Sequence, residues 1–211
     1  MAAVTKFSQS AIVNQLRHVE RTIQHNANTD IDPERFNLNY SLIDRDVSSY
    51  SYYKDRLSQC YLYNRPDVKT MCGWVITLPK DVPIDKSHEF FKVCFDYCNY
   101  LYGEENCVQA IAHYDEGGQP HLHYDFIPVV KDTKHAQGIK VNCHDLLTPR
   151  HLRDWHPGLE KYLHNRGIDC KICTGVTARQ GGAKTVKQLK AERDVKRERQ
   201  VARERTPILW T

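Results

Sequence analysis

The sequence predicts an α+β domain in which helices pack on an antiparallel sheet. Two segments, 8–25 and 87–103, repeat apolar residues at helical spacing. Three others, 73–79, 107–115 and 120–130, are rich in β-branched or aromatic residues and are expected to be strands. The turn EGGQ joins the last two, which is typical of a hairpin. With 211 residues, the chain is long enough for one such domain with a sizeable core.

The N-terminal half begins with the predicted helix 8–25, which carries four apolar residues on one face: Ile12, Leu16, Val19 and Ile23. Residues 26–46 are rich in Asn, Asp and Pro, so we expect turns there, with an extended stretch at NLNYSL. Residues 48–65 contain many tyrosines and are expected to form a short helix. The strand at 73–79 should end at Pro79.

In the C-terminal half, Gly103 is expected to close the helix 87–103. Residues 148–167 form a further helical pattern, in which Pro157 should interrupt the helix or start a second one. From Lys184 to Arg205 the chain is highly charged and mostly basic. We interpret this segment as a solvated helix or a partly disordered basic tail.

The composition, with 40% hydrophobic and 27% charged residues, indicates a soluble globular protein. The chain has neither an apolar run of about 18 residues, as a membrane span needs, nor a secretory signal. We therefore expect a cytoplasmic protein with no membrane partner and with its eight cysteines as thiols, including the single CxxC pair Cys170 and Cys173. The net charge of +4 does not by itself establish nucleic-acid binding.

Three histidines gather in the segment HYDEGGQPHLHYDFIPV, residues 113–129. Because side chains alternate along a strand, His121 and His123 share one face while Leu122 points to the core. A hairpin at EGGQ brings His113 roughly opposite residue 122 or 123, so the three imidazoles can meet. Such a cluster is typical of a half-open metal site that leaves positions for water or substrate.

A simpler interpretation is that His121 and His123 are exposed surface residues that share a face by chance. The third histidine across the turn, with Glu116 beside that turn, favours the metal site. Imidazole ligands suit Mn, Zn, Fe, Co or Ni better than Mg, although a substrate phosphate could supply the missing oxygens.

The same stretch resembles a known family. HYDEGGQPHLH is similar to the HxDExxPHxH signature of the MobV relaxases, which are plasmid mobilisation enzymes within the HUH endonucleases. Upstream, RHVERTIQHNANTDIDPERFNLNYSL resembles the family's HxxR motif, its Asp-Pro-x-Arg stretch and its Asn-Tyr pair, and GWVITLPKD resembles its tryptophan strand. The resemblance implies a relaxase domain of the HUH type over residues 1–190, followed by a basic C-terminal tail over 191–211.

The resemblance also implies a metal-dependent enzyme that nicks and rejoins one DNA strand at a plasmid transfer origin. The divalent metal, Mn before Mg, would be held by three histidines: His113, His121 and His123. His18 would attack phosphorus and form a 5′-phosphohistidine, and Arg21, one turn away, could pair with a phosphate oxygen. Glu116 would either coordinate the metal or hydrogen-bond a catalytic histidine.

The partner implied is plasmid origin DNA, as a single-stranded nick region with adjacent duplex or hairpin, and a homodimer is a further expectation. The motifs and the tyrosine-rich segment supply the candidate DNA contacts: Arg17, Arg35, Asn39, Tyr40, Lys54 and Arg56. The basic tail from Lys184 could bind duplex phosphates without sequence preference.

Two other functions fit parts of the sequence. A rolling-circle replication initiator would share the metal hairpin but use a tyrosine nucleophile, with Tyr40 and the tyrosines of 50–63 as candidates. A non-catalytic origin-binding protein would protect DNA without cutting it. The histidine hairpin together with His18 favours the relaxase.

Overall fold

The computed structural model describes residues 2–23, 30–173, 191, 192, 194 and 195. Residues up to Cys173 form one compact unit. Two expected features lie wholly or mostly outside the described residues: the end of the relaxase domain, residues 174–190, and the charged segment from Lys184 to Arg205. The expected boundary between residues 190 and 191 therefore stays a prediction.

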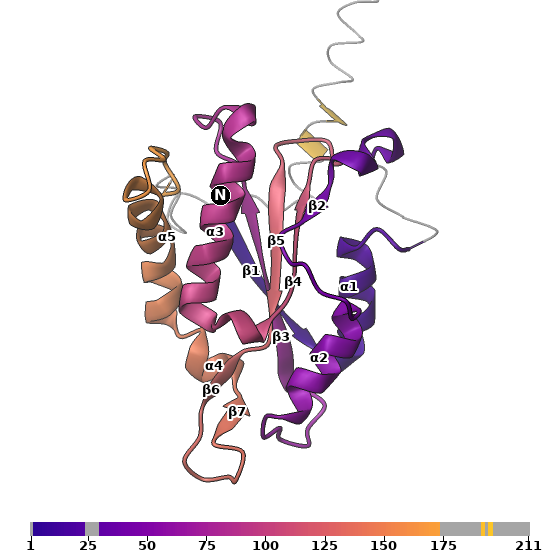
Figure 1. The fold of residues 1–211 in the computed structure, drawn as a ribbon, viewed down its shortest axis with the longest axis vertical. Helices are drawn as coiled ribbons and strands as arrows, with labels where there is room; N and C mark the ends of the chain where they lie inside the picture. The colour runs from indigo at the N-terminus through magenta and orange to yellow at the C-terminus, as the bar shows by residue number, and fades with distance from the viewer. Residues whose placement is uncertain (1, 24–29, 174–190, 193, 196–211) are drawn as a thin grey trace, which may run out of the picture. The chain divides into compact units, whose positions relative to one another are not determined.

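A five-stranded sheet forms the centre of this unit (Figure 1). Its strands lie in the order β1 (Ala2–Ser8), β3 (Lys69–Thr77), β5 (His121–Phe126), β4 (Cys107–His113) and β2 (Tyr40–Ser41). Every neighbouring pair is antiparallel, so the predicted α+β fold with an antiparallel sheet is confirmed. β5 is the middle strand, and all its residues are buried.

Helices cover both faces of the sheet (Figure 1). One face carries α3 (Ser87–Tyr102) and α5 (Pro149–His164), and the other carries α1 (Ile12–Val19) and α2 (Ser49–Ser58). The remaining elements are short: η1 (Gln9–Ala11), η2 (Pro33–Leu38), η3 (Ile84–Lys86), η4 (Glu104–Asn106), β6 (Val129–Lys131), β7 (Ile139–Val141) and α4 (Cys143–Leu146). In the described part of the chain, no helix is long and apolar enough to cross a membrane.

The larger core lies between the sheet and the α3–α5 layer. Trp74 of β3 stacks on Trp155 of α5 with ring centroids 3.8 Å apart, and its indole N–H donates to the Tyr102 hydroxyl at 2.9 Å. Tyr124 of β5 is fully buried and donates to Asn99 at 2.9 Å. The Trp74 and Tyr124 rings therefore bury large apolar areas while their polar atoms keep hydrogen-bond partners, whereas the buried Trp155 indole nitrogen has none within the described residues.

A second, smaller core lies under α1 and α2. Ile12 and Leu16 of α1 are buried against Met71, Val108 and Ile127. These α1 residues are four apart, so they lie on one side of the helix and face the sheet. This apolar contact seats α1 on the face of the sheet opposite to α3 and α5.

The structure differs from the sequence-based expectations at several elements. The helices expected over 8–25 and 48–65 are shorter, at Ile12–Val19 and Ser49–Ser58. The N-terminal strand β1 was not expected; it is an edge strand, and most of its residues are at least partly exposed, so the apolar alternation is weak. The expected break at Pro157 is wrong, because α5 runs without interruption from Pro149 to His164. Trp155 and Leu159 are buried on either side of the proline and keep the helix packed.

Candidate functional site

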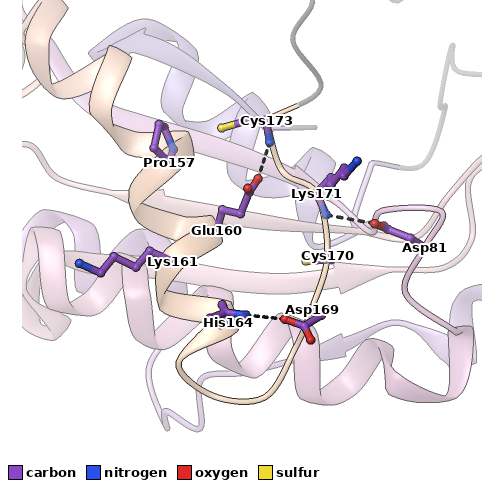
Figure 2. Close-up of a pocket in the computed structure, with 9 residues that line it drawn as sticks. All are labelled: Asp81, Pro157, Glu160, Lys161, His164, Asp169, Cys170, Lys171 and Cys173. Atoms are coloured by element: carbon purple, nitrogen blue, oxygen red, sulfur yellow. Dashed lines mark hydrogen bonds and ion pairs between the residues drawn. The ribbon is translucent and has the colours of Figure 1, made fainter.

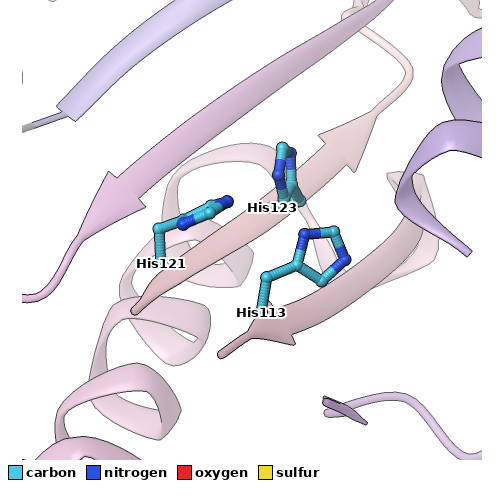
Figure 3. Close-up of side chains that lie close together, drawn as sticks. All are labelled: His113, His121 and His123. Atoms are coloured by element: carbon cyan, nitrogen blue, oxygen red, sulfur yellow. The ribbon is translucent and has the colours of Figure 1, made fainter. Parts of the chain in front are cut away.

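The hairpin of β4 and β5 brings the three histidines together. His113 pairs with His121, not with residue 122 or 123 as expected, and His123 is two residues further along the same face. Their rings point toward one another from the two strands (Figure 3), with centroids 4.6 to 5.4 Å apart. One ligand nitrogen from each lies within 4.8 Å of the others, so the three can share one ion.

His123 shows that the cluster suits a metal ion. Both its ring nitrogens are buried without a hydrogen-bond partner, an arrangement that costs free energy unless a ligand binds there. Burial and the neighbouring histidines hold the pKa of His123 well below its usual range, and burial also lowers the pKa of His121. Both rings are therefore neutral near pH 7, which is the form that binds metals.

His113 is held from both sides of its ring. Its Nε2 lies 2.8 Å from the carbonyl oxygen of Val19, and because a carbonyl only accepts, this nitrogen carries the hydrogen. Nδ1 then keeps the lone pair and accepts from Arg21 at 2.9 Å. Burial and the Arg21 charge lower the pKa of His113 to about 4. A metal bound at Nδ1 would replace the Arg21 hydrogen bond.

Helix α1 places His18 beside this cluster. The His18 ring is half-buried, and its centroid lies 6.3 Å from that of His123. Burial and the positive charge of Arg21 lower the pKa of His18. The imidazole therefore stays neutral near pH 7 and keeps a nucleophilic lone pair next to the candidate metal site.

Arg21 ends the helix and ties it to the hairpin. It has a φ of 57°, the left-handed region that glycine usually occupies after a helix, and the Thr22 N–H bonds back to the Arg17 carbonyl at 3.0 Å. Its guanidinium donates to the His18 carbonyl at 3.0 Å and to both Asp115 oxygens at 2.7 and 2.9 Å. These side-chain hydrogen bonds offset the strain of a non-glycine residue in the left-handed conformation.

The structure gives the Arg21 guanidinium carboxylate partners within the protein, and its expected contact with a phosphate oxygen stays a prediction. The side chain is only 6% exposed, and its terminal nitrogen also donates to Glu116 at 2.6 Å. Arg21 therefore links the His18 helix to the hairpin that carries the three histidines. Asp115, its fully buried partner, is the aspartate of the HxDE motif, two positions after His113, and the sequence alone indicated no role for it. Arg21 holds the pKa of Asp115 down against the effect of burial.

Glu116 lies at the open end of the cluster. One carboxylate oxygen accepts from Arg21, and the other is 4.0 Å from His121 Nε2. Glu116 is partly exposed, unlike the buried histidines. Its carboxylate can therefore reach either a metal ion or the His121 ring.

A buried polar group that sequence reasoning missed lies deeper on the same face. Asp125 of β5 is fully buried and accepts from Gln109 Nε2 at 2.6 Å and from Gln15 Nε2 at 3.3 Å. Burial raises the pKa of Asp125 to about 6, against the effect of these hydrogen bonds. The strand alternation that pairs His121 with His123 also extends to Asp125, which is the signal that could have found it.

The expected DNA-binding residues fall into three groups. Arg17 on α1, Arg35 on η2 and Lys54 on α2 are exposed. Asn39 accepts from the Tyr114 N–H at 2.8 Å and so braces the hairpin. The other two candidates, Tyr40 and Arg56, contact side chains of the protein itself.

Tyr40 and Arg56 have structural partners instead. Tyr40 pairs with Ala112, whose side chain lies on the face opposite to the histidines, and its ring stacks on His88 at 4.3 Å. Arg56 donates to Asn106 at 3.0 Å and to Gln59 at 2.8 Å, which joins α2 to η4. Their expected DNA contacts therefore stay predictions, and motif similarity alone does not say which face or partner a side chain has.

The CxxC pair lies away from the histidines, beside a cavity of about 560 Å³ between α5 and residues 168–173 (Figure 2). Glu160 accepts from the backbone N–H groups of Ile172 and Cys173 at 2.8 and 2.9 Å, which fastens this segment to α5. Cys170 and Cys173 are free thiols, as expected. Among the described residues, neither belongs to a group with metal-ligand spacing.

An antiparallel sheet with paired histidines on its middle strand, and a histidine helix packed on the same face, defines the class of HUH-type relaxase domains. The sequence pattern of the plasmid recombination enzymes matches residues 1–177, and the chain belongs to that family.

The relatives and solved structures agree with this assignment. Plasmid recombination enzymes from Streptococcus agalactiae and Lactiplantibacillus plantarum are 28% and 26% identical over 90% and 92% of this chain, which spans 38% and 54% of their lengths. The MobM relaxase domain (MOBV) bound to plasmid pMV158 oriT DNA, in a Mn-bound crystal structure at pH 5.5, is 27% identical with a TM-score of 0.75. That match covers 91% of this chain and 98% of the other.

Proposed function

We propose that this chain is a relaxase that nicks and rejoins one strand of plasmid origin DNA through a covalent bond to His18. The observation that carries the proposal is the position of His18, whose ring centroid is 6.3 Å from that of His123 in the metal-ligating cluster. The similarity to a Mn-bound relaxase domain in complex with oriT DNA supports the same site and substrate.

His113, His121 and His123 would hold a divalent metal, with Mn preferred and Mg as a weaker alternative because the ligands are imidazoles. When bound, the metal would supply positive charge for the scissile phosphate oxygens. Glu116 is the neighbouring carboxylate that could complete the ligand set or orient His121. The His113 hydrogen bond to Val19 fixes the ring tautomer and leaves Nδ1 as the ligand atom.

In the reaction, a neutral nitrogen of His18 attacks phosphorus, an N–P bond forms, and the bond from phosphorus to the 3′ oxygen breaks. The leaving 3′ oxygen takes up a proton from water and becomes a hydroxyl, the His18 imidazole releases its ring N–H proton to solvent, and the 5′ phosphate stays on His18. The phosphoramidate keeps the energy of the broken ester, so attack by a 3′ hydroxyl reverses the step and rejoins the strand. The lowered pKa of His18 favours the neutral form that attacks.

Exposed basic residues around the site fit a DNA strand. Arg17 lies next to His18 on α1, and Arg35 is exposed on η2. The chain before η2 is bound to the catalytic hairpin, because the Asp32 N–H donates to the Asp115 carbonyl at 2.7 Å. Arg35 is therefore held close to the hairpin and can pair with a backbone phosphate.

The test is to incubate the protein with a supercoiled plasmid carrying the origin that neighbours its gene, with Mn or Mg, and to identify the DNA-linked residue by mass spectrometry. We expect the adduct on His18, and His18→Ala should lose it while keeping the thermal shift that Mn produces. Tyr40→Phe should keep the adduct, because Tyr40 is on the other face. An adduct on a tyrosine would instead indicate a replication initiator, and DNA protection without cutting would indicate a binding protein.

A further inference from the structure

We propose that Gln15 and Asp125 form a positioning pair that sets the orientation of the His18 helix on the sheet. The pair lies outside the metal ligands and the nucleophile, and its effect on the reaction rests on the proposed function. The geometry on which it depends is a direct hydrogen bond between α1 and the middle strand β5.

Asp125 is an unusual group for the centre of a sheet. It is fully buried, and its recorded hydrogen-bond donors are side-chain amides: Gln109 on the next strand and Gln15 on α1. Burying a carboxylate is costly, so a buried one that joins two elements calls for a reason beyond packing. Asp125 lies two residues from His123 and shares its face of the sheet.

Gly73 supplies the space that Asp125 occupies. A Cβ atom at residue 73 would lie 2.1 Å from Asp125 Oδ1 and 3.1 Å from a ring carbon of Phe7. Because Gly73 is paired with Asp125 across β3 and β5, the missing side chain lets the carboxylate lie over the neighbouring strand. The sheet is therefore built to accept a carboxylate at this position.

Gln15 converts this buried carboxylate into a restraint on His18. Gln15 and His18 are three residues apart on α1, so they lie on one side of the helix. The apolar contacts of Ile12 and Leu16 hold the helix on the sheet, but dispersion contacts are not directional. A hydrogen bond has a preferred angle, so the amide between the two Asp125 oxygens limits rotation and sliding of the helix.

The pair can be tested by exchanging its two groups. Gln15→Glu places a second carboxylate against Asp125 and should slow adduct formation at saturating DNA by about 10- to 100-fold, the range expected for a misplaced reacting group. The double variant Gln15→Glu with Asp125→Asn restores an amide opposite a carboxylate, with the groups exchanged. It should recover the rate constant to within about threefold of wild type, a margin set by imperfect additivity of neighbouring changes.

Asn14→Glu is the matched control, because it adds the same charge to α1 at an exposed neighbouring position. It should leave the rate constant at saturating DNA unchanged. Because two carboxylates repel each other in a buried site, Gln15→Glu should lower the melting temperature whatever the role of the pair. A structural role alone would produce only this loss or a higher Kd for DNA, whereas positioning also lowers the rate constant of the folded protein at saturating DNA.

A second measurement tests the position of the helix without depending on adduct formation. Mn ions broaden nearby NMR signals in a distance-dependent way, so the broadening of the His18 ring signals, assigned with His18→Ala, reports where the helix lies. We expect it to change in Gln15→Glu and to return in the double variant. The positioning role of Gln15 and Asp125 would be overturned by either of two results. One is a folded Gln15→Glu protein with unchanged broadening and an unchanged rate constant, and the other is a double variant in which neither recovers. A wild-type protein that forms no His18 adduct would overturn only the proposed function. The NMR broadening would still test whether Gln15 and Asp125 position the helix.

Discussion

Leu122 and His123 are neighbours on β5, yet their side chains lie in different surroundings on opposite faces of the sheet. Leu122 is fully buried in the aromatic core under α3 and α5. The Trp74 indole and the Tyr124 hydroxyl on that face have hydrogen-bond partners, while the buried Trp155 indole nitrogen has none among the described residues. This face is mostly apolar and supplies hydrophobic free energy for folding.

The face of His123 is buried almost as well but is polar. His123 has two unpartnered ring nitrogens, and Asp125 is a carboxylate at zero exposure. Such groups cost stability unless a ligand or a hydrogen bond satisfies them. The same strand alternation thus gives one face that stabilises the fold and another whose stability depends on charge pairs and on a bound ligand.

The largest expected effect is at Arg21, where the histidine face depends on a buried ion pair. Arg21→Met leaves Asp115 charged and unpaired at zero exposure, so the free energy of unfolding should fall by about 3–5 kcal/mol. Urea unfolding of the metal-free protein measures the loss. Adding Asp115→Asn to Arg21→Met removes the unpaired buried charge, and the double variant should recover part of the lost free energy of unfolding. A loss below about 1 kcal/mol would mean that the pair behaves like an exposed one.

A cavity in the aromatic core under α3 and α5 should lower the free energy of unfolding. Leu122→Ala removes a fully buried side chain from the large core, and we expect a loss of about 2–5 kcal/mol in the free energy of unfolding. Leu122→Met conserves the volume and should cost less than about 1.5 kcal/mol. If calorimetry shows that both variants keep a Mn-induced shift in melting temperature, the two faces are energetically separate. Loss of that shift in a folded Leu122→Ala protein would contradict the separation.

How far the sequence predicts this fold can be seen at its strands. Alternation in HLHYDF predicted which residues of β5 face the core, because burial on one side fixes the register. It did not predict β1, whose edge position leaves a weak pattern, nor the continuity of α5 through Pro157. Both depend on contacts with distant parts of the chain, which local patterns do not contain.

For the site, motif spacing predicted the three histidines and His18 as candidates, and the structure brings all four together. It could not predict that the Arg21 guanidinium is taken up by Asp115 and Glu116, since this contact spans 94 residues of sequence. Hydrogen-bond partners at such separations follow from the packing of α1 on the hairpin. The DNA-binding and catalytic assignments remain proposals.

His123→Leu tests the polar face without opening a cavity. The variant removes two buried nitrogens that have no partner, so the metal-free protein should keep its stability within about 1 kcal/mol. It also removes a ligand, so the Mn-induced shift in melting temperature should disappear. The control is His144→Leu, whose side chain is 95% exposed and lies outside the cluster, and it should keep the shift. A preserved shift in His123→Leu would exclude this residue as a ligand.

The most gradual effect concerns pH. The folded-state pKa of His113 is lowered from 6.5 to about 4, so between these values the unfolded chain binds a proton that the folded chain does not. Stability from His113 is therefore fully present above pH 6.5 and is lost as the pH falls toward 4. Asp125 acts in the opposite direction, because its pKa is raised from 3.8 to about 6 and the folded chain keeps its proton longer.

Comparing wild type with His113→Asn separates the pH dependence of His113 from that of Asp125. Asp125 is present in both proteins, so its effect on the difference between them largely cancels. The plot of unfolding free energy against pH for the metal-free variant should be shallower between pH 6.5 and 4, by at most about 1.4 kcal/mol per pH unit. The absolute stability at pH 7 can also fall, because the variant loses the bond to Val19. Only the slope of unfolding free energy against pH shows whether the folded protein holds the His113 ring neutral. Equal slopes in the two proteins would mean that His113 has an ordinary pKa in the folded protein.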